Sequence, residues 1–249
     1  MQQKLAVVIL AAGKGTRMNN PDIAKVMYTI HRKPLIEYVV DLAVQLAPTK
    51  IIVVVGWRKD SVIAYLAKTH KPVTCVEQSP QLGTGHAVMQ AGQVLEGFRG
   101  DILVLSGDAP HLSYATTREL IDLHQSHDAA ATVLTALLDD PTGYGRILRN
   151  NEGKVVGIVE QKDATGEQRL LKEINSGIYV FNQDRLFEGL KHIKPLNAQK
   201  EYYLTDVFEY FWRNRLPVHA VLATGAREIM GINTPEQLEE ARAFLENRQ

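Results

Sequence analysis

The chain has 249 residues, with 28 basic and 28 acidic side chains, so its formal charge at neutral pH is zero. This balance argues against a general nucleic-acid-binding protein, which needs a basic surface to meet phosphates. A hydrophobic fraction of 45% and a charged fraction of 22% indicate a soluble globular protein with a sizeable core.

The first apolar stretch, Leu5–Ala12, is too short to cross a membrane, and no later run reaches about 20 apolar residues. We therefore expect a cytoplasmic protein with no membrane partner. The single cysteine, Cys75, excludes an intrachain disulfide, and its apolar surroundings predict a buried thiol.

Strand and helix signals alternate over the first half of the chain. Leu5–Leu10 is a continuous apolar run, typical of a strand buried on both faces of a parallel sheet. Pro34–Ala47 carries apolar residues at helical spacing. The same reasoning predicts strands at Ile51–Val55, Val73–Glu77 and Ile102–Leu105, and helices at Asp60–Ala67 and Gly85–Leu95. This alternation predicts a mostly parallel sheet with helices on both faces.

The pattern changes after about residue 128. The next segments are mainly strand-like: Ala130–Leu138, Gly145–Leu148, Val155–Glu160 and Ile174–Phe181. We expect antiparallel additions at the edge of the sheet and over its carboxyl ends. Helical patterns return at Leu204–Asn214 and Pro235–Asn247, the latter with Thr234 as N-cap and Gln237 completing a capping box. One α/β domain spanning residues 1–249 is the prediction.

The most specific local feature follows the first strand and reads Leu10-Ala11-Ala12-Gly13-Lys14-Gly15-Thr16-Arg17-Met18. Glycines let the backbone pass close to a ligand, and their N–H groups can hold phosphate. The Rossmann pattern needs glycine where Met18 stands, and the Walker pattern has no match. The nonapeptide resembles instead the signature of the sugar-phosphate nucleotidyltransferases, L-A-A-G-x-G-T-R-[ML].

This resemblance implies nucleotide contacts from one set of residues and catalytic charge from another. The implied nucleotide contacts in this loop are Leu10, Ala12, Gly13 and Gly15. Arg17 and Lys25 would spread positive charge over the triphosphate. The family usually has Pro-Lys where this chain has Ala24-Lys25, and one residue fewer in the preceding loop.

The segment Glu77–Ala87 resembles the uridine-binding segment of bacterial N-acetylglucosamine-1-phosphate uridylyltransferases. The resemblance implies that Gln78, Gly83 and Thr84 hold the base. A free glutamine amide can flip to suit uracil or cytosine. We therefore expect backbone groups near Ala12 and Gly83 to set a preference for UTP over CTP.

Asp108 follows the predicted strand Ile102–Leu105, and ligands bind at the carboxyl ends of strands in open α/β sheets. A carboxylate there suits Mg²⁺, which takes one or two protein oxygens besides phosphates and waters. The resemblance implies Asn233 as the second ligand of this Mg²⁺ cofactor. A turn-forming aspartate before Pro110 is the structural alternative.

The resemblance implies a sugar-phosphate site made of Gly107, Gly145, Glu160, Asn175, Tyr203 and Thr205. Each has an ordinary structural alternative when taken alone. Thr205 could be a helix N-cap, Tyr203 a core aromatic, and Glu160 a surface partner of Lys162. The family commonly has an aromatic residue beside the sugar where Ser106 stands.

The motifs run in family order over most of the chain. They imply a Rossmann-like three-layer nucleotidyltransferase fold, with a mixed, mostly parallel sheet and an antiparallel extension. Residues 1–128 would bind the nucleotide, and residues 129–249 the sugar phosphate. The implied reaction is Mg²⁺-dependent transfer of UMP from UTP to a sugar 1-phosphate, N-acetylglucosamine 1-phosphate first among them.

Two alternatives stay open at this point: another substrate such as glucose 1-phosphate, or a catalytically silent sensor of nucleotide sugars. The bifunctional bacterial enzyme continues into an acetyltransferase domain, whereas this sequence stops at Gln249. We therefore expect uridylyl transfer without acetyl transfer. We expect no nucleic-acid partner, and the sequence leaves a homo-oligomer open.

Overall fold

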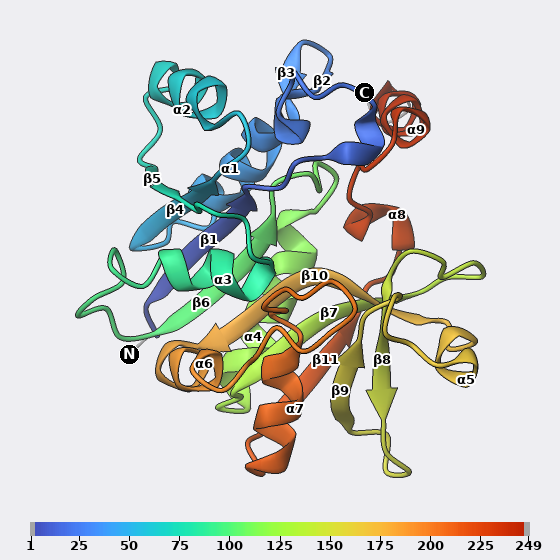
Figure 1. The fold of residues 1–249 in the computed structure, drawn as a ribbon. Helices are drawn as coiled ribbons and strands as arrows, with labels where there is room; N and C mark the ends of the chain where they lie inside the picture. Colours follow the sequence, from blue (N-terminus) through green and yellow to red (C-terminus); the bar gives the residue numbers. More distant parts are fainter. Residues whose placement is uncertain (1–2, 247–249) are drawn as a thin grey trace.

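The computed structural model describes residues 3–246, in which nine strands form one mixed sheet (Figure 1). Its main path runs in the order β11-β7-β10-β6-β1-β4-β5. The bounds are β1 Leu5–Ala11, β4 Lys50–Val55, β5 Thr74–Glu77, β6 Asp101–Ser106, β7 Ala131–Leu137, β10 Glu173–Asn182 and β11 Val218–Leu222. A hairpin of β8 (Gly145–Arg149) and β9 (Val155–Val159) pairs with β10.

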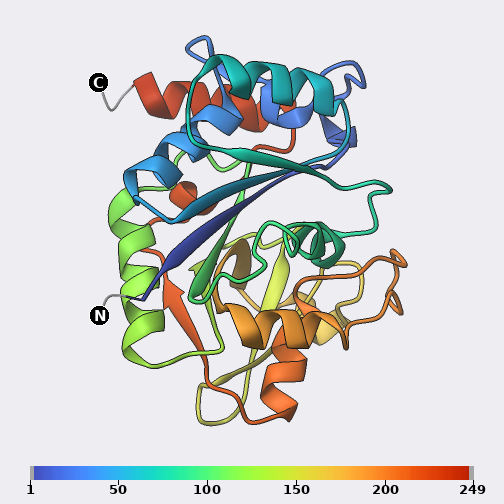
Figure 2. The same cartoon turned by 90° about the vertical axis from the view of Figure 1, so that its left-hand side faces the viewer.

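Helices cover both faces of the sheet and give three layers (Figure 2). Val7 and Ile9 of β1 pack on one face and Ala6 and Val8 on the other, all fully buried, as a continuous apolar strand requires. The first face carries α1 (Leu35–Gln45), α2 (Lys59–Lys68) and α4 (Tyr114–Ser126). The second carries α3 (Thr84–Gln90), α6 (Gln183–Leu190) and α7 (Asp206–Arg213).

Smaller elements complete the fold. They are the hairpin of β2 (Thr29–Ile30) and β3 (Lys33–Pro34), two 3-10 helices (Thr16–Met18 and Lys25–Met27), the short helices α5 (Gly166–Arg169) and α8 (Ala226–Ile229), and the last helix α9 (Pro235–Glu246). The predicted end of the last helix, Asn247, lies outside the described residues. Among residues 3–246, no helix combines the length and apolar character needed to cross a membrane.

The predicted direction of the later strands was wrong in part. β7 and β11 run parallel to the first-half strands, because α4 carries the chain back across the sheet after β6, and β10 alone on the main path is antiparallel. β10 lies inside the sheet, between β6 and β7, not at its edge. The predicted helix over Gly85–Leu95 ends at Gln90, and Cys75 is half-buried instead of fully buried.

This topology gathers loops at one edge of the sheet. The carboxyl ends of the parallel strands meet there, and the reversed β10 brings its amino end, with Asn175, to the same edge. A bulge shifts the register of β10 between Asn175 and Tyr179, with Gly177 at φ 79°. The edge is therefore where both predicted halves of the site can meet.

Candidate functional site

The loop after β1 turns sharply at Gly15, which adopts φ 61° and ψ 39°. A Cβ atom on Gly15 would lie 2.6 Å from Cβ of Lys25, so glycine is needed both for the backbone conformation and for close packing. The turn thus lets Lys25 lie directly against the glycine-rich loop.

Four of the predicted polar side chains converge beside this loop. The Lys25 ammonium pairs with Asp108 and also donates to Oδ1 of Asn233 at 2.9 Å. Arg17 Nη2 donates to the same Asn233 oxygen at 3.0 Å. Residues more than 200 positions apart in the sequence therefore meet at one point.

Asp108 is a buried carboxylate, 4% exposed, supported from two sides. Burial alone would raise its pKa, but the Lys25 ammonium, its hydrogen bond and a bond from Ser106 hold the pKa of Asp108 below its ordinary value. The Ser106 hydroxyl donates to Asp108 Oδ1 at 2.6 Å. The carboxylate is thus kept ionised in its buried setting.

The donor set fits the implied Mg²⁺. A carboxylate oxygen of Asp108 and the amide oxygen of Asn233 both reach the Lys25 ammonium, so two oxygens already converge on one cation. One carboxylate and one amide match the few protein ligands that Mg²⁺ takes beside substrate phosphates. Among the described residues no cluster of three or more His, Cys, Asp or Glu side chains could hold a metal, so substrate oxygens would have to complete this site.

The segment that carries Asn233 is fixed from behind. Ile232 N donates to the carbonyl of Asp108 at 2.9 Å, and a Cβ on Gly231 would approach Asp108 Oδ1 to 3.0 Å. Ile232 also packs with Met18, next to Arg17, in a small apolar cluster that α9 completes. This cluster explains why Arg17 and Asn233 meet.

The expected capping box of α9 forms in a shifted way. Gln237 N donates to Thr234 Oγ1 at 3.3 Å, as expected, but Gln237 Oε1 accepts from Asn233 N at 2.8 Å, one residue before the N-cap. Gln237 therefore positions the predicted metal ligand as well as the helix start.

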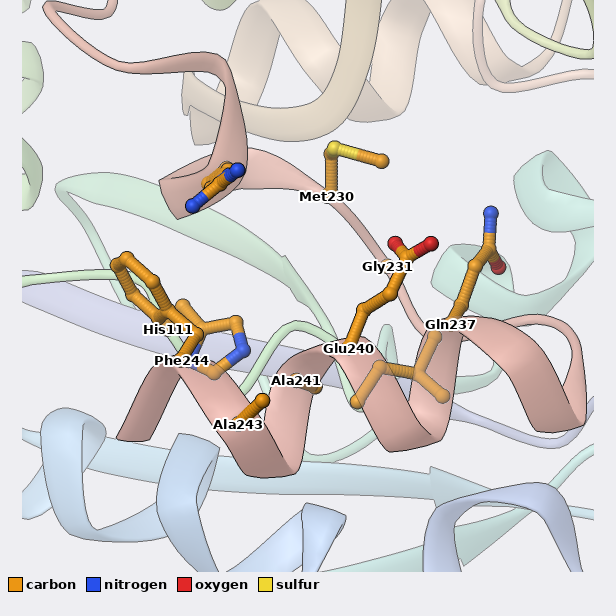
Figure 3. Close-up of a pocket in the computed structure, with 10 residues that line it drawn as sticks. His111, Met230, Gly231, Gln237, Glu240, Ala241, Ala243 and Phe244 are labelled. Carbon is orange, nitrogen blue, oxygen red and sulfur yellow. The ribbon is translucent and has the colours of Figure 1, made fainter. Parts of the chain in front are cut away.

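A cavity of about 630 Å³ adjoins this segment, between α9 and the chain from Arg227 to Ile232. In Figure 3, Gln237 and Glu240 project from α9, and Met230 lies across from them. Gly231 and Gln237 line this cavity, and both bond Asn233: Gly231 O accepts from Asn233 Nδ2 at 3.1 Å and Gln237 Oε1 accepts from Asn233 N. The shape of the cavity and the placement of Asn233 are therefore physically connected.

A second cavity of about 490 Å³ opens at the glycine-rich loop. All the predicted nucleotide-binding residues line it, together with Lys25 and Asp108: Leu10, Ala12, Gly13, Gly15, Gln78, Gly83 and Thr84. Its size is in the range of small-molecule sites, roughly 300–1,000 Å³. We call it the nucleotide cavity.

Gln78 is buried and held in one orientation. Its Nε2 donates to the carbonyl of Gly83 at 2.8 Å and lies 3.2 Å from Nδ1 of His86. If the amide flipped, Gln78 Oε1 would face the carbonyl oxygen of Gly83, and both atoms are acceptors. The expectation that Gln78 flips freely was therefore wrong. Carbonyl Ala12 O is also engaged, by Trp57 N at 3.1 Å. Gln78 Oε1 is therefore left to accept a hydrogen bond, which suits the N3–H of uracil.

The base segment is bonded to the predicted sugar segment. Tyr202 N donates to Leu82 O, and Gly85 N donates to Tyr202 O, both at 2.8 Å. The Thr84 hydroxyl accepts from Leu204 N at 3.0 Å. Gly83, at φ 103°, leaves no room for a Cβ, which would lie 2.6 Å from Tyr202 O. The two predicted halves of the site therefore share one backbone framework.

Four of the predicted sugar residues form a second group. A Cβ on Gly145 would lie 3.4 Å from both Asn175 Cβ and Glu160 Oε2. The Thr205 hydroxyl donates to Glu160 Oε1 at 3.1 Å, and Asn175 Nδ2 donates to the Tyr179 hydroxyl at 2.7 Å. Burial raises the pKa of Glu160, against the effect of the Thr205 bond.

The structure separates this group from the nucleotide cavity wall. Glu160, Tyr203 and Thr205 line a groove of about 980 Å³ between β9 and α7. Gly107 packs on β1, its N donating to Leu10 O at 2.9 Å, while Ser106 and Asp108 face the nucleotide cavity. The two sets of residues are joined through the Thr84 to Leu204 bond.

The ordinary alternatives for these residues find mixed support. Thr205 sits at the N-cap of α7, but its hydroxyl makes no cap bond and goes to Glu160 instead. Glu160 is partly buried with Thr205 as its bonding partner, and Tyr203 is buried like a core aromatic, 6% exposed.

Sequence reasoning left several residues of the site unassigned. Lys14, Ser106 and Glu201 line the nucleotide cavity. The Tyr144 hydroxyl is buried without a hydrogen-bond partner among residues 3–246, and burial, followed by the charge of Asp108, raises its pKa. Arg146 is 1% exposed and bonds Gln161 at 2.8 Å, which ties Gly145 to the next loop. The glycines flanking Tyr144 were the only local signal.

Comparison with known proteins identifies the family to which the chain belongs. The family model described as nucleotidyl transferase matches residues 6–248. The chain belongs to the nucleotidyl transferase family. This family membership confirms the resemblance to nucleotidyltransferases expected from the motifs.

The similar curated proteins are longer than this chain. The bifunctional protein GlmU of Pelotomaculum thermopropionicum is 43% identical over 244 residues, which make up 98% of this chain and 52% of that protein. The protein of that name from Streptococcus pyogenes serotype M12 is 45% identical over 241 residues, 97% of this chain and 57% of that protein. The chain spans about half the length of these relatives.

A solved structure of UDP-glucose pyrophosphorylase complexed with UDP-glucose superposes with a TM-score of 0.79. It is 22% identical and covers 99% of this chain and 100% of its own. This likeness confirms the predicted fold class, a mixed and mostly parallel α/β sheet.

Proposed function

We propose that the protein transfers UMP from UTP to a sugar 1-phosphate, first of all N-acetylglucosamine 1-phosphate, and releases pyrophosphate. The observation that carries this proposal is the convergence of Arg17, Lys25, Asp108 and Asn233. Two of these residues, Lys25 and Asp108, line the nucleotide cavity. Similarity to the GlmU proteins supports the choice of uridylyl transfer.

The chemistry asks for positioning and charge, not for a side-chain nucleophile. A phosphate oxygen of the sugar 1-phosphate attacks the α-phosphorus of UTP in line; the new P–O bond forms as the bond to pyrophosphate breaks and its electron pair leaves with pyrophosphate. Bound Mg²⁺, held by Asp108 and Asn233, would neutralise phosphate charge. Arg17 and Lys25 would stabilise the charge that develops on the phosphate oxygens.

The contacts of Lys25 suggest how the site responds to substrate. In this structure its ammonium holds the two oxygens that the metal would use. The same oxygens would hold the divalent cation, and Lys25 lies close enough to them to contact a phosphate group bound there. Gly15 packs against Cβ of Lys25 and so fixes the position from which the Lys25 side chain extends.

Gln78 supports uracil over cytosine. Its buried amide, fixed by Gly83 O, keeps Oε1 as an acceptor, and cytosine would offer an acceptor in return. An unpaired buried polar group costs about 1–3 kcal/mol. The same penalty corresponds to roughly one to two decades in kcat/KM between UTP and CTP.

A silent nucleotide-sugar sensor is disfavoured because a pure binder needs no convergent set of two oxygens and two cations. The test is pyrophosphate release from UTP with a panel of sugar 1-phosphates and Mg²⁺, including the N-acetylglucosamine and glucose compounds. We expect the fastest release with the N-acetylglucosamine compound. Binding of UTP without release on any member of the panel would contradict the proposal.

A further inference from the structure

Lys14 has no role in the site as described so far. It lines the nucleotide cavity and is exposed, and among residues 3–246 it has no acidic ion-pair partner. Its ammonium lies 5.5 Å from the centroid of the Trp57 ring instead. The Lys14 ammonium, beside a loop suited to bind anions, therefore makes a cation–π contact with Trp57.

Hydrogen bonds fix the position of Trp57 beside Lys14. Its backbone N donates to Ala12 O at 3.1 Å and its indole Nε1 to Pro21 O at 3.2 Å, so it contacts the chain both before Lys14 and after the glycine-rich loop. Arg58 also donates to Pro21 O, at 3.1 Å, and pairs with Asp22. Hydrogen bonds therefore connect Trp57 to the chain on both sides of Lys14.

The charge balance of the nucleotide cavity favours a further cation when a polyphosphate is bound. Lys25 is paired with Asp108, and Glu201 adds a second carboxylate to the cavity wall. A polyphosphate brings several further negative charges. A Cβ on Gly13 would meet nothing within 4 Å, so there is open space beside Lys14 on the side of the loop backbone.

We propose that Lys14 is a further polyphosphate-binding residue, which leaves the Trp57 ring to contact the terminal phosphates of a nucleoside triphosphate or free pyrophosphate. The exchange is favourable because an exposed cation–π contact is weak, whereas a charge-assisted hydrogen bond to phosphate is among the strong ones. This inference rests on the proposed function and adds a residue to the same site.

Calorimetric titration of the full chain with Mg–pyrophosphate, Mg–UTP and UMP tests the inference. Lys14→Met should raise the Kd of pyrophosphate and UTP about 10-fold, the scale of one charged hydrogen bond. UMP, which lacks the terminal phosphates, should bind unchanged. Lys68→Met, which removes an exposed lysine at the end of α2, is the matched control and should leave all three Kd values unchanged.

Fluorescence gives a second readout, because the chain has only two tryptophans. In a Trp212→Phe background, pyrophosphate should change the emission of Trp57, and Lys14→Met should abolish that change. Unaltered Kd values for pyrophosphate and UTP in Lys14→Met would overturn the role of Lys14, while the unmodified protein still bound and turned over UTP. If the unmodified protein bound neither ligand, the proposed function would fail as well.

Discussion

Replacing Gly15 by alanine tests whether the close packing of Lys25 against this glycine matters for turnover. Gly15 adopts a left-handed conformation, and its new Cβ would lie 2.6 Å from Lys25 Cβ. Carbon atoms in contact prefer about 3.5–4.0 Å, so Lys25 or the loop must move by roughly 1 Å. That displacement falls on the side chain that touches both predicted metal ligands.

The loss of folding stability in Gly15→Ala has two contributions. The left-handed conformation costs about 1–2 kcal/mol for a residue with a Cβ, and the overlap adds roughly 1–3 kcal/mol. A misplacement of about 1 Å at a catalytic centre can lower turnover roughly 100-fold. We therefore expect Gly15→Ala to lose about two decades in kcat and to unfold at a lower temperature.

Gly97→Ala is the control, since Gly97 has φ 72° but nothing within 4 Å of an added Cβ. It should show only the conformational cost of about 1–2 kcal/mol, a fall of roughly 2–8 °C in Tm, with kcat unchanged. Initial rates of pyrophosphate release and thermal unfolding of both variants are the measurements. Equal kcat in the two variants would refute the packing argument.

Three further outcomes are expected. Asp108→Ala should stay folded and lose roughly two to four decades of Mg²⁺-dependent turnover, the scale of removing one preorganised charged group; near-normal rates would remove Asp108 from the site. Gln78→Ala should raise KM for UTP and erase most of the preference over CTP, because the fixed acceptor is lost; competition between the two nucleotides measures this, and an unchanged ratio would return base choice to the backbone. Burial, with the charges of Glu160 and Glu209, raises the pKa of Asp206 to about 6, so the folded state binds the proton more tightly and stability should rise as pH falls from 7 toward 4; Tm against pH in the wild type and Asp206→Asn checks this, and parallel curves would contradict it.

Strands were easier to predict than the helices that connect them. The first-half strands are apolar runs such as Leu5–Ala11, and burial on both faces dictates that composition. Helix α4 escaped prediction because three of its five buried residues are polar: Thr116, Thr117 and His124. The buried His124 ring has a hydrogen-bond partner in Thr132 Oγ1 on strand β7, at 3.0 Å, so a polar residue occupies a position where an apolar one would have marked the helix in the sequence.

Single candidate residues of the site have signals in the sequence, whereas the network of contacts between them has none. The loop after β1 and the segment around Gln78 carry local signatures that imply their ligand. The contact of Lys25 with Asn233 spans 208 positions, and the Thr84 to Leu204 bond spans 120, so only the fold brings these partners together. For the same reason the fixed orientation of Gln78 could not be read from its own segment.

The most direct test of the account is to identify the product formed from UTP and N-acetylglucosamine 1-phosphate with Mg²⁺. Mass spectrometry with parallel pyrophosphate measurement should show UDP-N-acetylglucosamine and pyrophosphate in equal amounts, and Lys25→Ala should abolish both. Formation of free UMP, or no nucleotide sugar from any sugar 1-phosphate, would contradict the central claim that this edge of the sheet joins a uridylyl group to a sugar phosphate.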